Sequence, residues 1–336
     1  MEFTRLGIPA TLPLVAPWAM RVVASLAMFS LVAGVARVSK AWIVLPFALF
    51  AVLELTPWDH SLHQAAVLVA AGALAAGLVA RRTASGTSTG QMSDAAVRRH
   101  QTQAGIGLLR RLVSRTALDE RIDLLRLRLD TFPYGRYQPI EALPGRVKRA
   151  DGSISRWKAM RPVVERLNVS TGLDVGAYEG YFSIQLGSLG IATVALESAP
   201  THYRTALLAV RRTGLDNVGV LALEIRADTV ALTPAVDCTL FLSLWHHLVR
   251  WQGIDAATEI TAGLWAKTAQ VMFFDTGENE MPDWFDLPEM TPDPRVWLEG
   301  YLAATCPGGR VEHLGRHAAF DAEGNPCERN LFAVVR

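Results

Sequence analysis

The sequence has few charges and few cysteines for its length. Only 19% of its 336 residues are charged, while 50% are hydrophobic. With 33 basic and 32 acidic residues the formal net charge is +1, so a nucleic-acid partner is not indicated. The three cysteines, Cys238, Cys306 and Cys327, lie far apart and form no C-x-x-C pair. This spacing excludes a zinc ribbon and a disulfide scaffold, and it favours a reducing compartment.

Charge is most scarce in the first quarter of the chain, where three apolar runs cover residues 22–36, 41–53 and 65–80. A membrane-spanning helix needs about 20 apolar residues, so the short second run spans only if its flanks contribute. We therefore expect a transmembrane segment of two or three helices over residues 1–82. Two other readings remain for these runs: buried helices of a soluble protein and, for the first, a signal peptide.

The charges between these runs predict an orientation. Arg37 and Lys40 separate the first two runs, Glu54 and Asp59 lie between the next two, and Arg81 and Arg82 follow the third. Because Lys and Arg are enriched on the cytoplasmic side, we expect a multi-pass protein of the cell membrane with a cytosolic C-terminal part. The lipid bilayer is then the first expected partner.

Residues 83–154 are expected to form a linker followed by a basic amphipathic helical region. The linker, 83–93, is rich in Ser, Thr and Gly. Over 106–129, apolar residues recur at helical spacing among six arginines, which predicts one helix or a helix pair. Two roles are open for it: a helix lying on anionic headgroups, or a helix packing on the domain that follows.

Beyond residue 170, an apolar strand over 172–175 runs into a glycine-punctuated turn at 176–180 and a helix-spaced segment at 181–186. The dinucleotide fingerprint G-x-G-x-x-G is lacking, because Tyr178 and Tyr181 stand where two of its glycines belong. This argues against a pyrophosphate site and an NAD-linked oxidoreductase. Gly176 and Gly180 still permit close backbone approach to a ligand.

The pattern D-V-G-x-x-x-G, from Asp174 to Gly180, resembles motif I of the class I S-adenosylmethionine-dependent methyltransferases. The resemblance covers about residues 155–336, with Tyr137-Gln138 and Arg156-Trp157 similar to the lead-in before motif I. It implies S-adenosylmethionine as cofactor. The residues expected to bind it in this turn are Asp174, Gly176, Ala177, Tyr178 and Gly180.

A second apolar strand, 191–196, ends at Glu197, about 20 residues beyond the turn. A carboxylate at this place can accept hydrogen bonds from both ribose hydroxyls; a surface acid at a strand end is the alternative. The resemblance also implies that the segment after the third strand, with Glu224, Ile225 and Arg226, borders the adenine.

The fourth strand, 238–244, releases Ser243, Trp245, His246 and His247 at its carboxyl end, where open α/β sheets bind ligands. The segment resembles motif IV of the same superfamily, in the branch with L-S-x-x-H-H. We assign Ser243 to the cofactor, Trp245 to the acceptor, and His246 or His247 to the base that takes a proton from an acceptor hydroxyl. Alternatively, one histidine forms a hydrogen bond with the backbone and the other packs on the ring of Trp245.

A fifth strand leads to Asp275 and an acidic, aromatic loop containing Glu278 and Trp284. We assign these three residues to the acceptor, which could be a cation or a sugar; a solvated loop is the alternative. No metal site is expected, because the spacing of the acids is not specific.

Further strands are expected over 218–224, 311–314 and 331–335, and a helix over 254–266. With these segments, the resemblance implies an α/β fold over 155–336: a Rossmann-like, seven-stranded, mostly parallel sheet with a terminal antiparallel strand pair, preceded by an α-helical membrane segment. The favoured function is a membrane-anchored, S-adenosylmethionine-dependent methyltransferase that O-methylates a lipid or lipid-linked glycan. A small-molecule acceptor and a non-enzymatic membrane scaffold with a methyltransferase-like domain are the alternatives.

Overall fold

The computed structural model describes residues 93–112, 117–131, 135–148 and 150–336. The chain divides into two units, 1–88 and 89–336, and every described residue belongs to the second. The three apolar runs therefore lie outside the described residues. Within the described ranges, no helix is both long enough and apolar enough to cross a bilayer.

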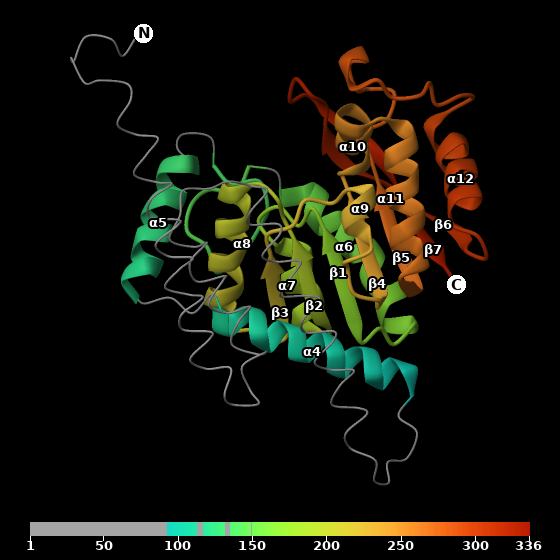
Figure 1. Cartoon of the computed structure of the whole chain (residues 1–336). Helices are drawn as coiled ribbons and strands as arrows, with labels where there is room; N and C mark the ends of the chain where they lie inside the picture. Colours follow the sequence, from blue (N-terminus) through green and yellow to red (C-terminus); the bar gives the residue numbers. More distant parts are fainter. Residues whose placement is uncertain (1–92, 113–116, 132–134, 149) are drawn as a thin grey trace, which may run out of the picture. The chain divides into compact units, whose positions relative to one another are not determined.

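The second unit is built on a seven-stranded sheet in the order β3-β2-β1-β4-β5-β7-β6 (Figure 1). Five strands run parallel, and β7 pairs antiparallel with both β5 and β6. The predicted mixed sheet with its terminal antiparallel pair is confirmed. The strands are β1 (Thr171–Val175), β2 (Ala192–Leu196), β3 (Val218–Leu221), β4 (Val236–Leu242), β5 (Thr268–Asp275), β6 (Arg310–Phe320) and β7 (Pro326–Val335).

Helices cover both faces of the sheet, and each face has its own apolar core. All residues of β1, β2 and β4 are buried, as expected for central strands of a parallel sheet. The helices on one face are α5 (Ala117–Thr131), α6 (Ala150–Arg166), α7 (Tyr181–Ser188) and α8 (Pro200–Thr213). Those on the other are α4 (Asp94–Leu112), α9 (Ala227–Val230), α10 (Trp245–Gln252), α11 (Ile254–Ala266) and α12 (Pro294–Thr305).

The basic region over 106–129 is a helix pair, α4 and α5, and its described part packs on the sheet unit. Ile106 of α4 is fully buried. Arg98, also on α4, donates from Nη2 to Oδ1 of Asp237 in β4 at 2.7 Å. Helix α5 packs against α8, which Figure 1 shows beside it. Helices α4 and α5 thus belong to the same compact unit as the sheet.

Three elements differ from their expected bounds. Strand β3 ends at Leu221 rather than 224, while β6 and β7 are longer than expected and pair along a hairpin from Phe320 and Pro326. The second half of β6, beyond residue 314, alternates between half-buried and exposed residues, so a search for apolar runs misses it. Helix α12 begins where its N-cap Asp293 accepts a hydrogen bond from the backbone N–H of Val296 at 3.1 Å.

Candidate active site at the carboxyl edge of the sheet

The glycine turn joins β1 to α7 at the edge of the sheet where the parallel strands end. Gly176 and Gly180 have φ values of 73° and 89°, a region that favours glycine. A Cβ on Gly176 would lie 2.9 Å from a side-chain carbon of Leu244, so a larger residue would strain the backbone and displace that side chain. The backbone N–H groups of Gly176 and Ala177 both donate to the Leu196 carbonyl at 2.9 Å, which ties the turn to the end of β2.

Glu197 lies beside this turn, as its position in the sequence predicted. Its Oε2 accepts a hydrogen bond from the backbone N–H of Tyr178 at 2.8 Å, and its Oε1 accepts one from that of Ala199 at 2.8 Å. Burial raises the pKa of the Glu197 carboxyl above its ordinary value, against the backbone donors that lower it. A carboxylate has about four acceptor sites, so beside the backbone donors Tyr178, Ala199 and Ser198 it could still accept a hydrogen bond from a ligand hydroxyl.

The side chain of Tyr178, at φ 57°, extends from the turn into an aromatic contact. Its ring centroid lies 3.9 Å from that of His202 and 5.3 Å from that of Tyr137. Burial lowers the pKa of His202, so the neutral ring packs against Tyr178. Tyr178 therefore connects the glycine turn with α8 and with the segment before α6.

Asp174, the acid of the expected motif, points into the protein. Its carboxylate accepts a hydrogen bond from the Ser183 hydroxyl at 2.6 Å, and burial raises its pKa to about 6. Its role in the structure is thus to link β1 with α7. The sequence placed Asp174 at the cofactor, whereas its hydrogen bonds are with Ser183 inside the protein.

Two residues that sequence reasoning left without a role hold the turn from the other side. Glu179 accepts a hydrogen bond from the backbone N–H of Gln138 at 2.8 Å, and Gln138 Oε1 accepts one from the backbone N–H of Tyr181 at 3.0 Å. The segment before α6 is therefore bound to the N-terminus of α7. The lead-in pair Tyr137-Gln138 was the signal in the sequence, but the reciprocal bonding requires the tertiary fold.

The next half of the edge, where β4 and β5 end, is organised by a buried ion pair. Asp275 accepts a hydrogen bond from Arg156 of α6 at 2.6 Å through Oδ2, and one from the Ser243 hydroxyl at 2.9 Å through Oδ1. Arg156 Nη1 also donates to Ser243 Oγ at 3.0 Å. Asp275 is thus engaged by internal partners, which corrects its expected role of contacting the acceptor.

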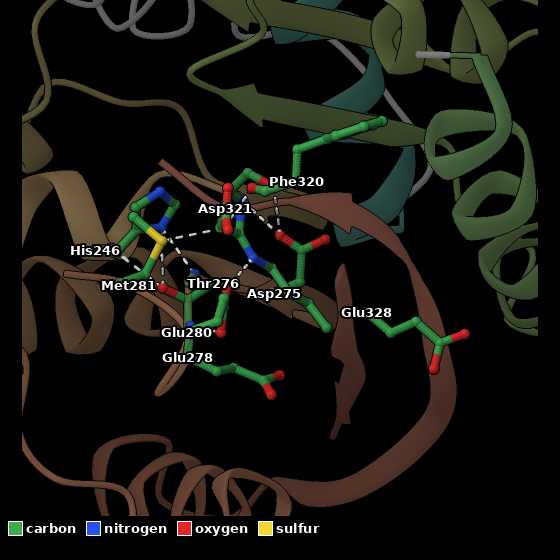
Figure 2. Close-up of polar contacts among 12 residues, drawn as sticks. His246, Asp275, Thr276, Glu278, Glu280, Met281, Phe320, Asp321 and Glu328 are labelled. Carbon is green, nitrogen blue, oxygen red and sulfur yellow. Dashed lines mark hydrogen bonds and ion pairs between the residues drawn. The ribbon is translucent and has the colours of Figure 1, made fainter. Parts of the chain in front are cut away.

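His246 is held at the start of α10 by the backbone that follows β5. Its Nδ1 accepts a hydrogen bond from the Gly277 N–H at 2.9 Å and lies 3.2 Å from Thr276 Oγ1 (Figure 2). Because a backbone N–H can only donate, the proton of the neutral ring is on Nε2. Burial lowers the pKa of His246 well below its ordinary value. His246 therefore matches the alternative in which one His bonds the backbone.

His247 is the less buried member of the pair. Its ring stacks on Trp251 at 5.1 Å between centroids, and Nδ1 has no hydrogen-bond partner among the described residues. Burial, with smaller effects from Arg329 and Arg250, lowers its pKa to about 4. The sequence suggested a base with a pKa near 6.5. The structure instead gives a neutral, weakly basic imidazole.

The side chain of Trp245 does not reach the carboxyl edge of the sheet. Its side chain is fully buried in the core, and its Nε1 donates to the Tyr301 hydroxyl of α12 at 2.8 Å. The expectation that it contacts the acceptor is therefore wrong, since the first turn of α10 directs it inward. Trp284, in the loop after β5, is 55% exposed, with the Arg250 guanidinium 4.2 Å from its ring centroid.

Two further residues expected near ligands lie at the margins. Glu224 follows β3 and has a side chain that is 45% exposed, with its carboxylate 3.6 Å from Arg226. Glu278 turns towards β7, where its Oε1 accepts a hydrogen bond from Asn330 Nδ2 at 2.9 Å. Figure 2 shows the Glu278 carboxylate directed away from His246. Within the described ranges, no group of three His, Cys, Asp or Glu residues is arranged to hold a metal ion.

No protein-family model matches the chain, and no curated protein matches it by sequence. Solved structures do resemble it in fold. The bifunctional kinase-methyltransferase WbdD superimposes with a TM-score of 0.50 at 21% identity, over 63% of this chain and 46% of WbdD. The N-terminal domain of EvdMO1, solved in the presence of SAH and D-fucose, gives a TM-score of 0.44 at 17% identity, over 66% of this chain and 100% of that domain. The chain thus spans less than half of WbdD, and the likeness to WbdD shows that it has a methyltransferase-like α/β fold.

Proposed function

We propose that this chain is an S-adenosylmethionine-dependent methyltransferase. The observation that carries the proposal is the pairing of a positive-φ glycine turn with a strand-end acid: Glu197 accepts a hydrogen bond from the Tyr178 N–H inside that turn. The residues fit the cofactor, because the Glu197 carboxylate retains acceptor capacity beyond its backbone donors. The sheet order and the carboxyl-edge position agree with this proposal.

In this proposal each cofactor residue has a separate task. The turn at 176–180 lets the backbone approach the cofactor, Glu197 accepts the ribose hydroxyls, and Glu224 lies on the adenine side. Ser243, whose hydroxyl donates to Asp275, follows β4, which is the neighbour of β1 in the sheet. When bound, S-adenosylmethionine supplies an electrophilic methyl group, and the chain contributes mainly by aligning the acceptor with it.

The contacts of the His pair favour His247 as the group that accepts the acceptor's proton. His246 uses Nδ1 for the Gly277 N–H and carries its proton on Nε2, so neither nitrogen is free to take another proton without breaking that arrangement. His247 is neutral at physiological pH, because its pKa is lowered to about 4. A base this weak assists little, so alignment supplies most of the acceleration.

We further propose that the acceptor is a hydroxyl of a lipid or lipid-linked glycan at the cytosolic face of the cell membrane. This rests on the three uncharged runs within residues 1–82, which suggest a multi-pass anchor. An anchor raises the local concentration of anything else held in the bilayer, which favours a membrane acceptor over a freely diffusing metabolite.

Two measurements test these proposals separately. Calorimetric titration of the full chain with SAH should show saturable binding; the scaffold alternative predicts none. Incubation with methyl-labelled S-adenosylmethionine and separated membrane and cytosol fractions should label membrane lipid or glycan. Label found only in cytosolic small molecules would support the methyltransferase proposal and contradict the proposal of a lipid or glycan acceptor.

A further inference from the structure

A hollow lies beside the loop after β5, and neither His246 nor His247 lines it. It has a volume of about 510 Å³ and is bounded by this loop and the β6–β7 hairpin. Its lining includes three carboxylates, Glu278, Glu280 and Glu328, but a single cation, Arg316. The volume is in the range of small-molecule sites. None of the residues proposed above to hold the cofactor lines it.

Two of the three carboxylates lie within 4 Å of an arginine. Glu280 accepts a hydrogen bond from Arg329 at 2.7 Å, and that arginine side chain is only 9% exposed. Glu328 lies 3.9 Å from Arg316. Neither ion pair uses Glu278, so the negative charge left over in the lining belongs to that residue.

Glu278 is the unusual member of this group. The residue is 4% exposed, and its Oε1 accepts both hydrogen bonds that reach the side chain, from the backbone N–H and Nδ2 of Asn330. Its Oε2 has no hydrogen-bond or ionic partner in the part of the chain that the structure describes. Burial raises the pKa of this carboxyl, the hydrogen bonds from Asn330 lower it, and the smaller effects of Glu280 and Arg316 raise and lower it, respectively. A buried carboxylate with no cation at salt-bridge distance is costly unless a ligand supplies one.

The lining of the hollow favours an organic cation over a metal ion. A metal ion would need several ligands converging on one point, and no such group of three occurs among the described residues. An ammonium group on a carbon chain needs only one carboxylate and space for its chain, both of which the hollow provides. We propose that this hollow, with Glu278 as its anchor, binds an organic ammonium group.

Cys327 makes this proposal testable on the full chain. It lines the hollow and is partly exposed, whereas Cys238 and Cys306, the other two cysteines of the sequence, are fully buried. Its alkylation by N-ethylmaleimide, followed by mass spectrometry, therefore reports on occupancy. The probes are 1,4-diaminobutane, its neutral analogue 1,4-butanediol, and Mg²⁺.

We expect the diamine to slow alkylation of Cys327 in a saturable way and the diol to have no effect. Glu278→Gln should raise the diamine concentration needed for half-protection at least about tenfold, because the charge-assisted contact is lost while an acceptor for Asn330 remains. The matched control, Glu259→Gln on the exposed face of α11, should leave the diamine concentration for half-protection unchanged. Equal protection by the diol, protection by Mg²⁺ alone, or an unchanged value in Glu278→Gln would overturn the proposal.

The ammonium group could belong to the methyl acceptor or to a separate ligand. Labelled S-adenosylmethionine distinguishes these sources: label on the diamine identifies an acceptor, while protection of Cys327 without label identifies a separate ligand. Either result supports the ammonium site. Because SAH binding is measured independently, loss of the methyltransferase proposal would not remove this site, and the reverse also holds.

Discussion

The two halves of the sheet's carboxyl edge are built in different ways. Where β1 and β2 end, the turn and Glu197 are joined by backbone hydrogen bonds among residues close in the sequence. Where β4 and β5 end, Ser243, Asp275 and Arg156 form a buried polar cluster whose members are up to 119 residues apart. The first half depends on backbone conformation, whereas the second depends on satisfying buried charge.

The largest effect should come from breaking the second half. Asp275→Ala leaves Arg156 buried without its carboxylate, and we expect the free energy of unfolding to fall by about 3–5 kcal/mol in urea titrations of the full chain. Arg161→Ala breaks the exposed pair with Glu165 and should cost less than about 1 kcal/mol. Replacing both members, as Arg156→Met with Asp275→Leu, should recover part of the loss. Similar small losses in all three variants would show that the ion pair does not organise this edge.

The pH dependence of the free energy of unfolding tests the first half, through the buried carboxyl of Asp174. Burial raises its pKa to about 6, above the ordinary 3.8, so its favourable contribution is present below 3.8 and is lost as the pH rises through about 6. Asp174→Asn should therefore raise the free energy of unfolding at pH 8, by at most about 3 kcal/mol, and leave it nearly unchanged at pH 4. The exposed Asp255→Asn serves as control. A gain of the same size at both pH values would contradict a raised pKa.

Cofactor binding should depend on Glu197 more than on Glu224. Glu197→Gln removes the charge but keeps one acceptor for the backbone, and we expect the dissociation constant for SAH to rise about 10- to 100-fold. Glu224→Gln, at an exposed side chain, should change it less than about threefold. Calorimetry measures both variants, with their unfolding midpoints as a check on folding. Unchanged affinity in Glu197→Gln would remove this carboxylate from the site.

The smallest effect concerns the His pair at physiological pH. Since the pKa of His247 is lowered to about 4, its ring should not titrate between pH 6 and 8. NMR of histidine-labelled protein should give a midpoint near 4 for the signal that disappears in His247→Gln. The ring loses its proton as the pH rises through that value, so any activity that needs the neutral form should be lost only below it. A midpoint near 6.5 would show an exposed, ordinary histidine instead.

Local patterns were read correctly where short-range geometry decides. The turn at 176–180 needs glycines because its φ values are positive at both ends, and the spacing from Gly176 to Glu197 follows from one strand, one helix and the next strand. The same holds for α11, whose predicted bounds 254–266 agree with the structure. Such features depend on neighbours in the sequence, which periodicity records.

Contacts between distant segments were missed or misassigned. Trp245 and Asp275 both follow strands and were expected at the acceptor, but the first faces α12 and the second faces Arg156. Glu278 was grouped with them, and it turns instead to Asn330 in β7. Position at a strand end gives the edge of the sheet on which a residue lies, but not the direction of its side chain.

For this protein, sequence alone determined the glycine turn and the place of its strand-end acid, because both follow from local spacing and backbone geometry, and the resemblance of that turn to motif I implied the seven-stranded α/β fold. Only the tertiary structure decided which polar side chains are hydrogen-bonded inside the protein and which keep free acceptor or donor sites. The same burial lowered the pKa values of His246 and His247. That information depends on burial and on contacts between residues far apart in the chain, which no local pattern contains.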